Sequence, residues 1–147
     1  MSKNTATYDD VNLVIKLYES RREPRLREAR SWFMANFHAT TLEEVAAICP
    51  PGSPEEASMR MVVSHWEMVA SFIKSGVLNP DLFFESGGEL LIAWIRVEPM
   101  VAALRQTYGN PFMFHNLEAV GKQYGEWLNA RSPGSYDGFA AMIRTRR

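Results

Sequence analysis

Apolar residues in the middle of the chain recur with the spacing of an α-helix. Between residues 54 and 75 one stripe follows intervals of three and four, through Met59, Val62, Val63, Trp66, Val69, Ala70 and Ile73. A second stripe, Met61, Met68 and Phe72, lies on nearly the opposite side. A helix that is apolar on two sides needs neighbours on two sides. The pattern therefore predicts the central helix of a bundle, or a helix whose second stripe forms an interface with another subunit.

Both ends of this helix carry capping residues. Ser53 stands at the N-cap position, Pro54 suits the first helical position, and Glu56 at the third can return a hydrogen bond to the Ser53 amide. At the other end Lys74 complements the negative end of the helix dipole, and Gly76 can take the left-handed conformation that closes a helix. The predicted helix is about 33 Å long at about 1.5 Å per residue.

Further helices are predicted on both sides of the central one. The first carries Val11, Val14, Ile15 and Tyr18 on one side, with Leu13 and Leu17 beside them. The starts of the helices are expected at Asp9 or Asp10, at Arg25, after Thr40 or Thr41, after Asn79, at Glu89 and after Pro111, and a short helix covers 139–143. Pro99 falls inside the segment 89–108, where we expect a bend because proline cannot donate to the carbonyl of Ile95.

The fold class that follows is all-α, a compact bundle of about five to seven helices around a central helix at about 54–75. No strand-like alternation and no internal repeat occurs in the 147 residues. We expect one domain, residues 1–147, with less ordered ends at 1–7 and 132–147. A chain near this size buries about two-thirds of its unfolded surface, so it needs neither a metal nor a disulfide to be stable.

Composition narrows the class of protein. With 46% hydrophobic residues, 22% charged residues and a net charge of -1, the chain has no overall field that would attract nucleic acid or an anionic membrane. The lone Cys49 cannot form an internal disulfide, and Arg96 ends the apolar run Leu90–Ile95 well short of a membrane span. The first ten residues lack the apolar stretch of a signal peptide. We therefore expect a soluble, cytoplasmic protein that does not associate with membranes.

The sequence contains no recognisable catalytic or metal-binding motif. His65 and Glu67 form an H-x-E triplet, but the P-C-x-x-C that would complete a zinc deaminase site is absent. Residues two apart on a helix also point in directions about 200° apart, so these two cannot bind the same ion. Cys49 stands at a helix end with no feature that would lower its pKa. We expect no catalytic residue, no cofactor and no metal.

One polar constellation stands out. Glu67 lies at the edge of the main apolar stripe and Arg105 lies on the seam of the later helix, so packing of the two helices can bring them together at the margin of the core. Arg30, between Ala29 and Phe33, is a third candidate member. A buried carboxylate needs a partner because an unpaired buried ion costs several kcal/mol. We expect a salt bridge that sets the register of the helices rather than a catalytic group.

The densest charge lies in the stretch ESRREPRLREAR, residues 19–30, which contains Arg21 and Arg30. Its interleaved glutamates cancel much of the positive charge, and mixed runs of this kind are typical of solvated helix faces. Nucleic-acid binding through this stretch is therefore the weakest of the functional alternatives.

The run W-E-x-x-A-x-x-I-x-x-G-x-L, from Trp66 to Leu78, followed by a helix with Pro99 and Arg105, resembles a family of bacterial helical domains of unknown function. The resemblance covers about residues 25 to 120. In that family an aromatic-Glu pair recurs in the middle helix, and some members carry an amino-terminal membrane helix, for which we expect no counterpart in this chain. The resemblance implies an all-α fold and no particular activity.

Two classes of function follow from these observations. The first is a non-catalytic interaction or self-association module, a homodimer for example, with Met61, Met68 and Phe72 at its interface; the partner is a second copy or another protein. The second is a small-molecule-binding protein or enzyme with a pocket between helices, lined by Trp66, Trp94 and Tyr108, with Glu67 and Arg105 as its polar groups.

Overall fold

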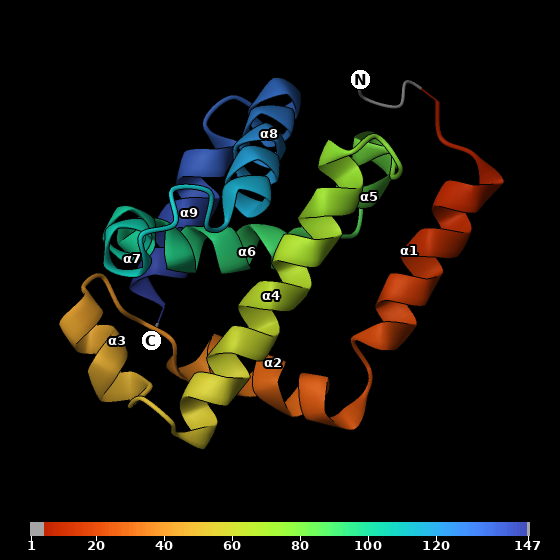
Figure 1. The fold of residues 1–147 in the computed structure, drawn as a ribbon. Coiled ribbons are helices and arrows are strands. Elements are labelled where there is room, and N and C mark those ends of the chain that lie inside the picture. Colours follow the sequence, from red (N-terminus) through yellow and green to blue (C-terminus); the bar gives the residue numbers. More distant parts are fainter. Residues whose placement is uncertain (1–4, 147) are drawn as a thin grey trace.

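The computed structural model describes residues 5–146, and every regular element in this part of the chain is helical (Figure 1). The elements are α1 (Tyr8–Ser20), α2 (Pro24–Asn36), α3 (Leu42–Ile48), α4 (Pro54–Lys74), α5 (Pro80–Phe84), α6 (Gly88–Val97), the 3₁₀ turn η1 (Glu98–Met100), α7 (Val101–Tyr108), α8 (His115–Arg131) and α9 (Ser135–Thr145). The predicted all-α fold class is confirmed. Residues 1–4 and 147, which belong to the ends expected to be less ordered, lie outside the described residues.

Helix α4 runs through the middle of the molecule (Figure 1) and packs against α2, α6 and α8. Its main apolar stripe is buried from Val62 to Ile73, with Val69 and Ala70 fully removed from solvent, and Met59 is half-buried. The second stripe is covered only in part. Met61 and Phe72 are half-buried against the core, whereas the Met68 side is open and this residue is 41% exposed.

The ends of α4 follow from the capping residues. The Ser53 hydroxyl accepts a hydrogen bond from the Glu56 amide at 3.1 Å. The Glu56 carboxylate accepts from the amide of Gly52 and not, as expected, from that of Ser53, because the Ser53 amide donates to the carbonyl of Pro50. At the other end Gly76 is left-handed with φ 85°, and its amide donates to the carbonyl of Ile73.

Helix α1 begins earlier than its aspartates suggest. Thr7, not Asp9 or Asp10, is the N-cap. The Asp10 carboxylate accepts a hydrogen bond from the Thr7 amide at 2.7 Å. The buried Asp10 also accepts from the amide of Asn79 at 2.9 Å, which joins the start of α1 to the start of α5. Thr41, one of the two residues proposed, caps α3.

Pro99 divides the segment that was predicted to be one bent helix. Helix α6 ends at Val97, η1 contains the proline, and α7 starts at Val101. Figure 1 shows α7 turned away from the direction of α6. The bend therefore takes the form of a 3₁₀ turn, in which the loss of one amide donor is tolerated.

The carboxyl-terminal helices close the core on the side of α6. The Trp94 side chain, 2% exposed, packs on α8, where a Cβ at Gly121 would lie 2.4 Å from the Trp94 ring. Helix α9 packs against α6 and α8 through the buried Ala140 and Ile143. It is longer than the short helix expected at 139–143, because it begins at Ser135 and ends at Thr145.

Candidate functional site

A groove of about 670 Å³ lies between α3, α4, α7 and the connection from α7 to α8. Four methionines contribute to its lining, Met59 and Met61 from α4, Met100 from η1 and Met113 from the connection, and we call it the methionine groove. Methionine side chains are flexible and polarizable, so a surface rich in them adapts to differently shaped apolar partners.

The floor of the methionine groove is part of the core and its edge is open. Val63, Val97 and Met100 are buried at the bottom. Tyr108 lines the groove and is 67% exposed, while Arg60 and Glu56 supply charge on the side of α4 and form a weak ion pair at 3.5 Å. An apolar floor with an exposed aromatic ring and a few charges beside it is typical of a binding surface.

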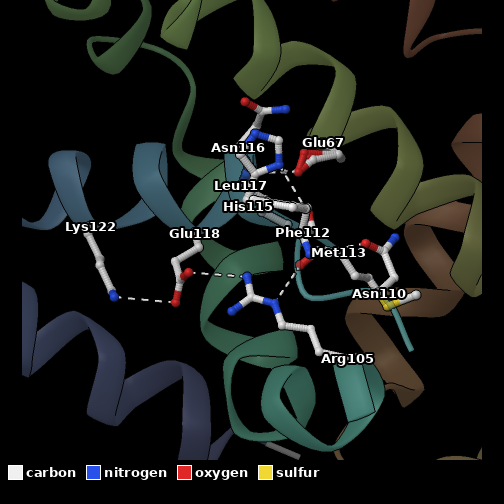
Figure 2. Close-up of polar contacts among 10 residues, drawn as sticks. All are labelled: Glu67, Arg105, Asn110, Phe112, Met113, His115, Asn116, Leu117, Glu118 and Lys122. Carbon is white, nitrogen blue, oxygen red and sulfur yellow. Dashed lines mark hydrogen bonds and ion pairs between the residues drawn. The ribbon is translucent and has the colours of Figure 1, made fainter. Parts of the chain in front are cut away.

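The connection that forms one wall of this groove is held by Arg105 (Figure 2). Arg105 Nε donates to the carbonyl of Met113 at 2.9 Å, and Arg105 Nη2 donates to Glu118 Oε1 at 3.1 Å. Burial alone would raise the pKa of Glu118, but hydrogen bonds from Arg105 and Lys122 outweigh it and lower this pKa. Arg105 thus links α7, the connection and the first turn of α8.

Glu67 holds the other side of the same connection. Glu67 Oε1 accepts hydrogen bonds from the amides of Asn116 and Leu117 at 3.0 and 3.1 Å, as Figure 2 shows. These amides belong to the first turn of α8, where helical donors have no partner within the helix and where a negative charge is favoured by the helix dipole. A residue of α4 therefore acts as the cap of α8.

The local sequence of α8 explains why this cap must come from elsewhere. Its N-cap residue, Phe114, makes no side-chain capping bond and has φ 60°. This left-handed conformation is unfavourable for a bulky residue and persists only where the surrounding structure holds it. Phe114 also lines the methionine groove, so the strained residue lies at the candidate site.

The three residues expected to form one polar cluster are separated in the structure. Glu67 and Arg105 both contact the segment around the start of α8, but they bind different groups and do not pair with each other. Arg30 lies in a different cluster, where its Nη2 is 2.7 Å from Glu89 Oε2, and Arg21 contacts the same carboxylate at 2.9 Å. Two arginines of the charged stretch are therefore neutralised in part by one acid of α6.

The pocket expected between Trp66, Trp94 and Tyr108 is not formed by these residues. Trp94 is buried against Gly121, Trp66 lines a cavity of about 20 Å³ beside α1, and Tyr108 lines the methionine groove. The reason is the 3₁₀ turn at Pro99, which directs α7 and its Tyr108 away from the packed face of α6.

Helix α1 carries apolar residues on two sides, one buried and one exposed. The periodicity of the sequence did not show which side is which. Leu13, Val14 and Leu17 pack against the core. The exposed side, which we call the α1 stripe, is formed by Tyr8, Val11, Ile15 and Tyr18, each at least 39% exposed. The two sets overlap in sequence, so only the packing of α1 shows which one faces solvent.

Cys49 is a buried free cysteine. Burial, followed by the charges of Glu55 and Glu56, raises the pKa of the Cys49 thiol to about 11, which leaves it protonated at neutral pH. Within residues 5–146, no group of three or more His, Cys, Asp and Glu side chains is arranged to hold a metal ion.

Residues 6–124 match a family described as "Domain of unknown function (DUF4760)". The chain belongs to this family. No curated protein and no solved structure matches the chain significantly. In this DUF4760 domain, none of the helices within the described residues combines the length and the apolar character needed to cross a bilayer. The α4 motif of Trp66 and Glu67 lies inside the matched region, as do the α1 stripe and the methionine groove.

Proposed function

We propose that this DUF4760 domain is a self-association module in which the α1 stripe of one copy packs into the methionine groove of another. The observation that carries the proposal is the presence, on one chain, of an apolar groove and of a helix whose outer side carries four exposed apolar residues. Helix-in-groove docking uses apolar side chains at i, i+3 or i+4, and i+7.

The dimensions of the two surfaces are compatible. The groove residues on α4 extend from Glu56 to Ser64, about 12 Å at about 1.5 Å per residue. Val11, Ile15 and Tyr18 of the α1 stripe have the spacing i, i+4, i+7 and extend over about 10 Å. Three apolar side chains of α1 therefore fit along the part of α4 that the groove exposes.

The charges beside the two surfaces are mixed. The guanidinium groups of Arg21 and Arg22 lie over the Tyr18 ring at the end of the α1 stripe, and Arg60 and Glu56 form an ion pair beside the groove. Because the two surfaces differ, the contact is heterologous and builds rings or chains of copies. Three exposed side chains bury little area, so we expect weak association, in about the micromolar to millimolar range.

Complementation between two variants tests the proposal. Ile15→Glu disables the α1 stripe and leaves the groove intact, whereas Met61→Glu disables the groove and leaves the stripe intact. Sedimentation velocity over a concentration series should show association for the unaltered chain and monomers for each variant alone. An equimolar mixture of the two variants should give a 1:1 complex that grows no further, because only one stripe and one groove remain functional.

Controls separate association from folding. Met142→Glu places the same charge at an exposed apolar position of α9, outside both surfaces, and should leave the association unchanged. Tyr108→Ala is a second groove variant that leaves the core intact, since this side chain is largely exposed. A chain that remains monomeric at all concentrations, or variants whose mixture does not assemble, would refute the proposal.

A further inference from the structure

Arg96 of α6 is a buried cation, only 7% exposed. Its Nη1 donates to the carbonyls of Phe33, Met34 and Phe37 at 3.1, 2.8 and 3.2 Å. These carbonyls lie at the carboxyl end of α2, where helical carbonyls run out of amide donors. The carbonyl of Phe33 also accepts from the amide of Phe37. All hydrogen bonds of the Arg96 guanidinium to the described residues therefore come from Nη1, and they fix the plane of the guanidinium.

The rest of the Arg96 side chain has no partner in the described part of the chain. Its Nε is buried without a hydrogen bond, and Arg96 takes part in none of the ion pairs among residues 5–146. Buried charges in proteins are normally paired. Burial lowers the pKa of Arg96, and the positive charge of Arg146 lowers it further.

Arg96 lines a cavity of about 250 Å³ between the connection from α2 to α3, α3, α6 and α9. Ile95 and Ile143 give the cavity apolar walls, and Arg144 and Glu44 also line it. Arg144 is paired with Glu98 at 2.9 Å, and Glu44 accepts hydrogen bonds from the hydroxyls of Thr40 and Thr41. Arg144 therefore has a counter-ion and Glu44 has hydrogen-bond partners, so Arg96 is the lining arginine without a counter-ion within the described range.

We propose that this cavity binds a small molecule through its carboxylate or phosphate group, which accepts a hydrogen bond from Nη2 of Arg96. A hydrogen bond between a guanidinium and such a group is strengthened by the two opposite charges, and the apolar walls strengthen it further by excluding water. The volume is below the roughly 300–1,000 Å³ of sites for drug-sized ligands, so the ligand is small. This ligand site is separate from the methionine groove and does not depend on the proposed self-association.

Titration with inorganic phosphate, with acetate and with chloride at constant ionic strength tests the site in the full chain. Thermal unfolding and the NMR signal of the Arg96 Nε–H group are the readouts. Phosphate or acetate should raise the unfolding temperature with saturation and shift this signal, and chloride should do neither. A response to phosphate alone assigns a phosphate ligand, and a response to acetate alone assigns a carboxylate ligand.

Two pairs of variants make the test specific. Arg96→Lys keeps the charge but loses the planar guanidinium and with it the Nη2 donor, and it should weaken binding by about tenfold or more. Thr40→Glu, at an exposed position of the lining, places a carboxylate beside the cavity and should abolish the response, whereas Thr40→Gln, the uncharged control, should retain it. Equal responses to all three anions, no response to any, or full binding by both Arg96→Lys and Thr40→Glu would overturn the proposal.

Discussion

Glu67 of α4 caps the amino end of α8 by accepting the amide of Leu117 at 3.1 Å. The two residues are separated by 50 positions in the sequence. The contact joins the central helix to the segment that forms one wall of the methionine groove, which Arg105 holds from the other side (Figure 2). The packing of the fold and the shape of the candidate site therefore depend on the same carboxylate.

Replacement of Glu67 should destabilise the protein. Glu67→Ala leaves the amides of Asn116 and Leu117 without their acceptor, so we expect a loss of about 1–3 kcal/mol in the free energy of unfolding. Glu67→Gln keeps one acceptor oxygen but loses the charge, and it should lose less. Urea unfolding measures both values, with Glu126→Ala on the exposed side of α8 as the control. A loss for Glu67→Ala no larger than that of the control would contradict the capping role.

Two glycine-to-alanine changes should have opposite effects. A Cβ at Gly121 would lie 2.4 Å from the ring of the buried Trp94, so Gly121→Ala should cost about 1–3 kcal/mol through overpacking. A Cβ at Gly138 in α9 meets no atom within 4 Å, so Gly138→Ala should stabilise the helix by up to about 1 kcal/mol. Thermal unfolding of the two variants provides the comparison. Equal effects would mean that α6 and α8 do not pack as closely as described.

Stability should fall when the pH is lowered through the ordinary pKa of histidine. Burial lowers the pKa of His65 from 6.5; the charges of Arg30 and Arg21 lower it further, and that of Glu89 opposes them. The unfolded chain therefore binds a proton near pH 6.5 that the folded chain binds only at lower pH. Protonation favours the unfolded state, so this contribution to stability is complete above about pH 6.5 and is lost below it.

Urea unfolding at pH 7.5 and 5.5 measures this effect. The carboxyl groups with lowered pKa values, Glu23 and Glu118, start from 4.5 and change their charge at lower pH, so they do not mask it. His65→Gln should reduce the difference between the two pH values, and His115→Gln, on a different helix, should leave it intact. If His65→Gln retains the full difference, another group is responsible.

Features that depend on neighbouring residues were predicted well. The cap at Ser53, the left-handed Gly76 and the buried stripe of α4 each arise within a few turns of one helix, so their signals lie in consecutive residues. The wrong N-cap predicted for α1 also concerns neighbouring residues. Thr7 and Asp10 form a capping box, and Asp10 was assigned the position of the cap instead of the third helical position.

Contacts across the fold could not be predicted in the same way. Glu67 was expected to pair with Arg105, but its partners are backbone amides of α8. Because nearly every residue type carries a backbone amide, the sequence does not indicate which amides a carboxylate will bind. Arg96 was recognised only as the end of an apolar run. Its burial beside a cavity results from the position of α2 and α9 against α6.

The sequence by itself determined that this protein is built of helices, where most of them begin and end, and that α4 is apolar enough to lie at the centre. These properties follow from helical periodicity and from caps, which act over about one turn. Only the tertiary structure decided which side of α1 is exposed, that Pro99 separates Tyr108 from Trp94, and that a methionine groove and a buried, unpaired Arg96 exist. Each of these depends on the relative placement of helices, which is set by the packing of many side chains at once.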